Sequence, residues 1–189
     1  MTEIIGILLA AGSARRFGAH KLLQPQRDGV TVATAAAKTV RKVLPNTIAV
    51  VSPGDYPLIE LFTELGLHVV ENPLAEAGMG TSLAAGITAT VGADGWLIAL
   101  ADMPWIQPET INAVAERLLK GASIVAPVYA GRRGHPVGFS RRWLQPLRSL
   151  SGDSGARDLI TEHADELELF TTEDAGVLKD IDYPQDLNR

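Results

Sequence analysis

A loop of glycines and basic residues follows the first apolar run of the chain. Gly12 is followed by five residues, Gly18, two residues and Lys21. Glycines let backbone N–H groups approach a phosphate closely, and a lysine adds a mobile positive charge. The spacing is not that of a Walker A loop, because Gly18 is followed by Ala19, and Gly12 lacks the glycine two residues later that a dinucleotide fingerprint needs. The pattern predicts another kind of anion-binding loop; the alternative is a structural turn.

A single carboxylate, Asp102, closes the apolar run Trp96–Ala101 and is followed by Met103-Pro104. Where a buried strand meets a ligand crevice, a carboxylate suits Mg²⁺, a hard cation that prefers oxygen ligands. The alternative is a residue that starts the next turn. Near the end of the chain, in DIDYPQDL, Asp182 is a candidate second metal ligand. The alternative there is a solvated acidic tail, which we expect for Asp186.

Glycines also precede the polar pair Thr81 and Ser82 in NPLAEAGMGTS. Gly78 and Gly80 relax the backbone just before a predicted helix. Free N–H groups and hydroxyls at a helix start suit a base edge or a phosphate. The alternative is that these residues form a helix cap.

A basic segment, RRGHPVGF, is followed shortly by GDSGAR. The two gather charged side chains around glycines: Arg132, Arg133, His135, Asp153 and Arg157. A histidine before proline is usually structural. Inside the most basic stretch of the chain, His135 is instead a candidate contact for a substrate phosphate.

These loops sit between alternating strands and helices. Strands are predicted at Ile4–Ala10, Thr47–Val51, Leu67–Glu71, Gly95–Ala101 and 123–128, and helices at about 30–43, 58–65, 81–91 and 108–121. The last third predicts a short strand around Val137–Phe139, two helices and a final strand ending near Asp180. The alternation indicates an α/β fold, Rossmann-like, with a mostly parallel sheet between two layers of helices. Ligands bind such sheets beyond the carboxyl ends of the strands, where the loops above fall.

Composition narrows the class of protein. The 189 residues suit one domain, and no apolar run approaches the roughly 20 residues that span a bilayer. The absence of cysteine excludes disulfides, thiolate catalysis and Fe–S clusters, and fits a cytoplasmic protein. The net charge of −5 argues against nucleic acid as the main partner. Residues 1–27 and 131–148 nevertheless carry net charges of +3 and +5. On their number alone these charges indicate a solvated surface, which is common. Together with the glycine-rich loops, the two basic segments suggest a local anionic ligand.

The order of these motifs resembles one family. LLAAGSARRFGAHKLL is similar to the opening signature of MobA-like nucleotidyltransferases, and ALADMP to their metal-binding aspartate segment. GMGTSLAAGI, RGHPV, GDSGAR and DIDYPQDL resemble blocks of the molybdenum cofactor cytidylyltransferase branch. Guanylyltransferase relatives tend to have Gly-Pro-Leu where this chain has GMGTSLAAG, so the resemblance favours CTP over GTP. The family's serine falls on Ala14 here, and Ser13 is the nearest replacement.

The resemblance implies a nucleotidyltransferase-type fold and a distribution of roles. The triphosphate would contact the first loop, through Ala11, Gly12, Ser13, Arg16, Gly18 and Lys21. The nucleobase would lie near Gly80, Thr81 and Ser82. Mg²⁺ would bind Asp102 and Asp182, and the acceptor would contact Arg133 and His135. Lys21, Arg16 and Asp102 would be the catalytic residues. Within one domain, 1–189, an NTP-binding part (about 1–128) would precede an acceptor-binding part (about 129–189). The acceptor would be molybdopterin carrying its metal, with a molybdoenzyme as a possible recipient of the product.

A phosphate acceptor is already a nucleophile at neutral pH, so the expected reaction needs positioning and charge neutralisation rather than a serine, cysteine or general base. Three alternatives stay open. The chain could be another member of the superfamily, such as a guanylyltransferase or an enzyme acting on a phosphorylated sugar, alcohol or lactate. It could be a non-catalytic chaperone that binds the pterin cofactor. A P-loop kinase is disfavoured by the loop spacing.

Overall fold

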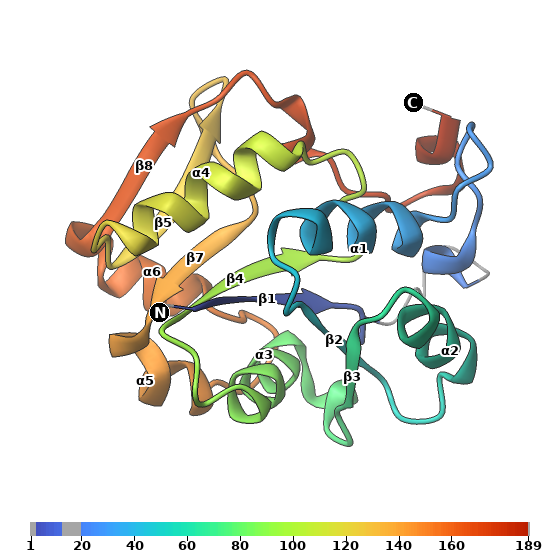
Figure 1. Ribbon diagram of the computed structural model, residues 1–189, viewed down its shortest axis with the longest axis horizontal. Helices are drawn as coiled ribbons and strands as arrows, with labels where there is room; N and C mark the ends of the chain where they lie inside the picture. Colours follow the sequence, from blue (N-terminus) through green and yellow to red (C-terminus); the bar gives the residue numbers. More distant parts are fainter. Residues whose placement is uncertain (1–2, 13–19, 189) are drawn as a thin grey trace.

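The computed structural model describes residues 3–12 and 20–188 (Figure 1). Three candidate phosphate-loop residues, Ser13, Arg16 and Gly18, lie outside the described residues, as does Ala14. Ala11, Gly12 and Lys21 lie within them.

An eight-stranded sheet forms the centre of the molecule. Its strands are β1 (Ile4–Leu9), β2 (Ile48–Val51), β3 (His68–Glu71), β4 (Gly95–Leu100), β5 (Ile124–Tyr129), β6 (Arg132–Arg133), β7 (Val137–Ser140) and β8 (Leu167–Thr171). They lie in the order β3-β2-β1-β4-β7-β5-β6, with β8 also paired to β5. The pairs among β1 to β4 and the β5–β8 pair are parallel, whereas β7 is antiparallel to both β4 and β5. The predicted mostly parallel α/β sheet is confirmed.

Helices cover both faces of this sheet. They are α1 (Val32–Val43), α2 (Tyr56–Glu64), α3 (Met79–Ala89), α4 (Pro108–Leu119), α5 (Leu144–Arg148) and α6 (Arg157–Glu162). One core cluster packs α1, α2 and α4 against one face, and the other packs α3, α5 and α6 against the opposite face. Successive residues of β1 alternate between the clusters, Ile7 in one and Leu8 in the other, because strand side chains alternate in direction. This explains why the central strands are apolar without interruption.

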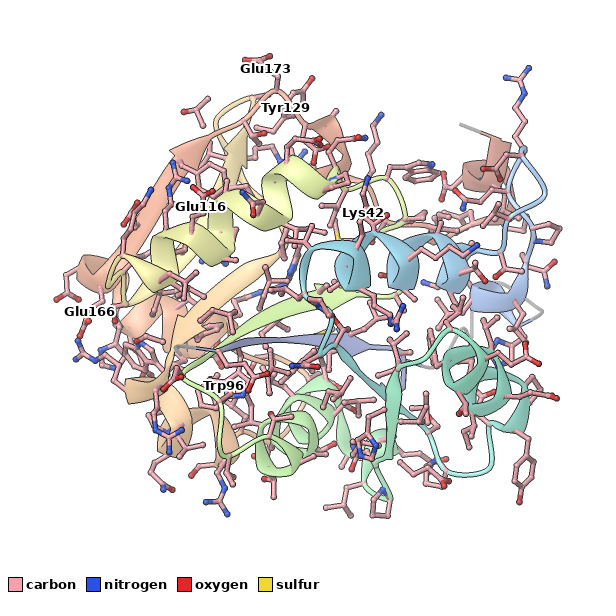
Figure 2. The ribbon with its side chains drawn as sticks, viewed as in Figure 1. Lys42, Trp96, Glu116, Tyr129, Glu166 and Glu173 are labelled. Atoms are coloured by element: carbon pink, nitrogen blue, oxygen red, sulfur yellow. The ribbon has the colours of Figure 1, made fainter. Side chains whose placement is uncertain are left out.

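Figure 2 labels one core side chain and several surface side chains on this framework. Trp96 of β4 is fully buried below the sheet, and its indole N–H donates to Thr90 Oγ1 at 3.0 Å. Lys42 and Glu116 lie on the outer surfaces of α1 and α4. In the described part of the chain, no helix is both long enough and apolar enough to cross a membrane.

The last third departs from the sequence-based expectation. The predicted final strand near Asp180 is wrong: the strand is β8, and Ala175–Leu178 form a short 3-10 helix instead. Asp174 determines this turn, because its carboxylate accepts from Gly176 N–H and also from Gln107 N–H and Thr110 Oγ1 at the start of α4, each at 2.8 Å. These bonds tie the C-terminal segment to α4 rather than to a sheet edge.

The expectation that Asp186 lies in a solvated tail is also wrong, because Asp186 is only 4% exposed. Its carboxylate accepts from the backbone N–H groups of Asp182 and Tyr183, at 3.1 and 2.9 Å, and so holds the turn that carries Asp182.

Candidate active site

A cleft of about 1110 Å³ opens at the carboxyl ends of the parallel strands. Its lining comes from the loops after four strands: Ala10, Ala11 and Gly12 after β1, Ser52, Pro53 and Asp55 after β2, Pro73, Ala75 and Glu76 after β3, and Asp102 after β4. Lys21, Ser82 and Asp153 add to it from elsewhere in the chain. The motifs predicted to carry chemistry therefore converge where parallel sheets bind ligands.

The central contact of the cleft joins Lys21 to Asp102. Lys21 Nζ donates to Asp102 Oδ2 at 2.8 Å and lies 3.9 Å from Asp182 Oδ1. The Lys21 side chain is only 14% exposed, so its charge faces the two carboxylates with little water around it. The structure thus brings together three residues that the sequence analysis selected from loops far apart in the chain.

Backbone hydrogen bonds place both carboxylates. Ala101 N–H donates to Leu9 O at 3.0 Å, which extends the β1–β4 pairing as far as the residue before Asp102. Ile181 N–H donates to Asp102 O, also at 3.0 Å. The segment 180–182 is therefore held directly against Asp102, which explains how a residue near the C-terminus reaches the cleft.

The cluster is strongly charged. Burial raises the pKa of the Asp180 carboxyl above its usual range, and the nearby carboxylates of Asp182 and Asp102 raise it further. The backbone N–H of Asp180 and the Lys21 ammonium act in the opposite direction. Asp102 Oδ1 is buried and has no hydrogen-bond partner among the described residues. Asp102 and Asp182 lie beside one ammonium, and Asp102 Oδ1 is unsatisfied among the described residues, so these two carboxylates could accept an additional cation that is completed by ligand oxygens.

Ala11 and Gly12 form the near wall of the cleft. Ser52 Oγ donates to Ala11 O at 3.2 Å and so ties the β1 loop to the β2 loop. Among the described residues, no atom lies within 4 Å of a Cβ placed at Gly12, so this part of the structure leaves the Gly12 backbone open to the cleft. A ligand can approach that backbone closely.

The residues at the start of α3 behave differently from one another. Thr81 turns its hydroxyl into the protein, where it lies 2.7 Å from Leu74 O and 2.8 Å from Gly78 O. Gly80 N–H donates to Gly152 O at 2.8 Å. Ser82 is buried but lines the cleft. Of the three residues predicted near a nucleobase, Ser82 therefore faces the cleft with a polar side chain.

Asn72 organises this wall and was missed by the sequence analysis. It is 3% exposed, and its Nδ2 lies 2.9 Å from Thr81 Oγ1 and 3.0 Å from Ser82 Oγ. Its Oδ1 accepts from Leu74 N–H at 3.0 Å. The Asn-Pro pair after the third strand was the signal for such a turn.

A second omission is the contact between the two glycine-rich segments. A Cβ at Gly80 would lie 2.7–2.9 Å from three backbone atoms of Ser151. A Cβ at Gly78, which has φ of 114°, would lie 2.3 Å from the carbonyl carbon of Gly152. The glycines of GMGTS thus let the loop of GDSGAR pack directly on α3, and this contact places Asp153 in the cleft.

His135 and Arg133, the predicted acceptor contacts, lie next to this cleft rather than in its lining. His135 N–H donates to Val177 O at 2.9 Å, and a cis peptide bond joins His135 to Pro136. Burial lowers the pKa of His135 to about 4; the Asp102 carboxylate opposes this shift and Arg133 adds to it. The imidazole is therefore neutral at pH 7. Its Nδ1 is buried without a hydrogen-bond partner in the described part of the chain, whereas Arg133 is exposed on β6.

One more pair in the cleft had no sequence signal. His20 Nε2 lies 2.9 and 3.0 Å from the two carboxylate oxygens of Asp55. Asp55 also caps α2 by accepting from Leu58 N–H at 3.4 Å. The pair joins the residue before Lys21 to the loop after β2, so it helps to position Lys21.

The sheet order is that of a nucleotidyltransferase-type fold, and solved structures of similar proteins have the same fold. Rv0371c from Mycobacterium tuberculosis superposes with a TM-score of 0.84 at 28% identity, over 98% of this chain and 95% of that one. A structure of Rv0371c in complex with manganese superposes with a TM-score of 0.75 at 26% identity, and the superposition covers 100% of this chain and 94% of that one.

The family model for the MobA-like NTP transferase domain matches residues 6–167, so the chain belongs to that family. Among curated relatives it is 30% identical to the purine catabolism protein PucB of Bacillus subtilis, over 97% of this chain and 93% of that protein. It is 28% identical to a nicotine blue oxidoreductase of Paenarthrobacter nicotinovorans, over 98% of this chain and 95% of that protein. It is 24% identical to the molybdenum cofactor cytidylyltransferase of Escherichia coli, over 98% of this chain and 94% of that protein.

Proposed function

We propose that this NTP transferase moves CMP from CTP to the terminal phosphate of the molybdenum cofactor and releases pyrophosphate. The observation that carries the proposal is the Lys21–Asp102 pair at the carboxyl ends of the strands, in a cleft formed by the family's sequence blocks. The likeness to the cytidylyltransferase of Escherichia coli supports the choice of nucleotide and acceptor.

The reaction needs no protein nucleophile. An oxygen of the acceptor phosphate forms a bond to the α-phosphorus of CTP, and the bond to the bridging oxygen breaks as pyrophosphate leaves. Lys21, with Arg16 from the loop, offsets charge on the leaving group. Ala11, Gly12, Ser13 and Gly18 contribute backbone donors to the triphosphate. These groups act by fixing geometry and by neutralising charge, which are the main requirements of phosphoryl transfer.

A divalent cation fits the acidic side of the cleft. Asp102 Oδ1, buried and unpartnered among the described residues, and Asp182 Oδ1 near the same ammonium would hold it. Mg²⁺ commonly takes one or two carboxylates and completes its shell with phosphates and water. The described residues contain no group of three His, Asp or Glu side chains that could hold a metal without such additional ligands. When bound, Mg²⁺ neutralises phosphate oxygens. The manganese in Rv0371c supports a divalent ion here.

The remaining roles divide between two parts of the single domain, about 1–128 for the nucleotide and about 129–189 for the acceptor. Gly80 and Thr81 shape the wall near the base, and Ser82 faces it. His135 and Arg133 meet the acceptor: the arginine as a cation, and the neutral imidazole as a hydrogen-bonding group.

The relatives' names leave other activities to be tested. A nicotine blue oxidoreductase is similar over nearly the whole chain, but the loop after β1 lacks the glycine spacing of dinucleotide-binding enzymes. A pterin-binding chaperone would keep the basic surface without needing Lys21 and Asp102 to act together.

The test is pyrophosphate release from CTP, GTP, ATP or UTP with metallated molybdopterin and Mg²⁺. We expect release with CTP, abolished by Asp102→Ala and by chelation of the metal, while the exposed Asp158→Ala control keeps wild-type activity. Release with a different nucleotide would overturn the choice of CTP but keep the chemistry. Tight pterin binding with no release from any nucleotide would favour the chaperone.

A further inference from the structure

The two ends of the cleft differ in chemistry. One end carries Lys21 beside Asp102 and the open backbone of Gly12. The other end has apolar surface from Met79, which is 46% exposed, together with the Ser82 hydroxyl and the Asp153 carboxylate. Both ends belong to one continuous cleft of about 1110 Å³, large enough for a nucleotide.

Cations set the direction of a bound nucleotide. Lys21 is the only lysine or arginine among the described residues that line the cleft, and the proposed divalent ion would offset the carboxylates of Asp102 and Asp182 beside it, so this end suits a triphosphate. Asp153 lines the other end as a carboxylate and does not attract a triphosphate. The uncharged base would then lie at the Met79 end, where an exposed thioether offers polarisable surface to an aromatic ring.

Asp153 is held there by backbone contacts. Gly80 N–H donates to Gly152 O at 2.8 Å, and the missing side chains of Gly78 and Gly80 let the two loops touch. The loop position therefore depends on α3, which also carries Ser82. Helix α3 therefore fixes the positions of both polar groups in the wall of the cleft.

The two groups differ in hydrogen-bonding sense. Ser82 Oγ accepts from Asn72 Nδ2 at 3.0 Å, which leaves the hydroxyl proton free to be donated into the cleft. The Asp153 carboxylate can only accept. The end wall thus presents a donor and an acceptor.

We propose that Asp153 and Ser82 select the base: Asp153 accepts from the exocyclic amino group of cytosine, and Ser82 donates to the neighbouring ring nitrogen or carbonyl oxygen. Uracil has a carbonyl in place of that amino group, and its oxygen would face the carboxylate. The wall therefore selects CTP against UTP. This selection rests on the proposed function, since it concerns the same nucleotide site.

The test compares CTP with UTP, which differ in this edge. Nucleotide affinity by calorimetry with Mn²⁺, and kcat/KM for pyrophosphate release, are measured for wild type, Asp153→Asn, Asp153→Ala and Ser82→Ala. Asp158→Asn is the matched control, because Asp158 is an exposed carboxylate on α6 and does not line the cleft. We expect Asp153→Ala to lower kcat/KM for CTP about 10- to 100-fold, as for loss of one hydrogen bond to a charged group, and not to lower it for UTP, because the uracil carbonyl no longer faces a carboxylate.

Asp153→Asn gives the sharper result. Its amide can donate to the uracil carbonyl, so the CTP-to-UTP ratio should fall through a gain in UTP use. Equal losses for both nucleotides, or an unchanged ratio in every variant, would overturn the selection while leaving the transferase proposal intact. A wild-type protein that binds neither nucleotide would overturn both. Ser82→Ala tests the hydrogen-bond donor separately from the Asp153 acceptor, because Asn72 Nδ2 keeps its hydrogen bond to Thr81 Oγ1 when the Ser82 hydroxyl is removed.

Discussion

Lys21 allows the most demanding test of the site, because its contributions to stability and to catalysis are measured by separate assays. Its ammonium pairs with Asp102 at 2.8 Å and both side chains are part-buried, so Lys21→Ala leaves the carboxylate without its cation and should cost about 1–3 kcal/mol of unfolding free energy. For a chain of 189 residues that corresponds to a fall in Tm of roughly 2–12 °C.

The catalytic loss is a separate quantity. Lys21 is a preorganised donor beside the expected leaving group, and removal of one such donor costs about 2–4 kcal/mol of transition-state stabilisation. This predicts a fall in kcat/KM of roughly 30- to 900-fold, with CTP and Mg²⁺ saturating for the kcat measurement.

The assay pairs steady-state pyrophosphate release with a thermal melt on the same samples. Lys120→Ala is the matched control, because Lys120 is 77% exposed and only pairs with Glu116 along α4, at 3.7 Å. A loss below fivefold for Lys21→Ala, with a normal melt, would remove Lys21 from the phosphate site. A large loss explained by unfolding would show that the pair is structural.

Two further predictions concern the walls of the site. Gly80→Ala should destabilise the protein by about 1–3 kcal/mol in urea unfolding and weaken CTP binding, because the new Cβ would lie 2.7–2.9 Å from the Ser151 backbone. Gly92→Ala is the neutral control, because no atom of the described residues lies within 4 Å of a Cβ at Gly92. Equal effects of the two substitutions would refute the loop contact. Burial lowers the pKa of His135 to about 4, so between pH 6.5 and 4 the unfolded chain binds more protons and stability should fall as pH falls, by about 1–3 kcal/mol. His135→Gln should lose that part of the pH dependence when urea unfolding is compared at pH 7 and pH 5.

The sequence predicted those features that depend on local pattern. The uninterrupted apolar runs of β1, β2 and β4 require burial on both faces, and so the parallel sheet and the position of Asp102 at its edge followed directly. The family was found because its motifs are continuous in the chain. Roles at Ser13, Arg16 and Gly18 stay predictions, as do those at the described site residues.

Features that depend on distant contacts were not predictable in this way. Nothing near Asp174 shows that its carboxylate bonds to Gln107 and Thr110, and these bonds turn an expected strand into a 3-10 helix. The Gly80–Gly152 contact likewise joins two glycine-rich segments that could each be read only as a separate turn. Burial of Asp186 depends on a fold of the chain around its own carboxylate.

Strand β7 has a consequence for the order in which the protein is made. It is the only strand among those described that joins β4 to β5, and it pairs with both in the antiparallel sense. The parallel unit β1 to β4, with Lys21 and Asp102, is synthesised first and has its own β–α–β contacts. Asp153 and Asp182 follow only after β7 has been added. During translation, Lys21, Asp102 and the α3 residues Met79 and Ser82 are therefore complete before Asp153 and Asp182 exist, so the cleft acquires its last two carboxylates only late in synthesis.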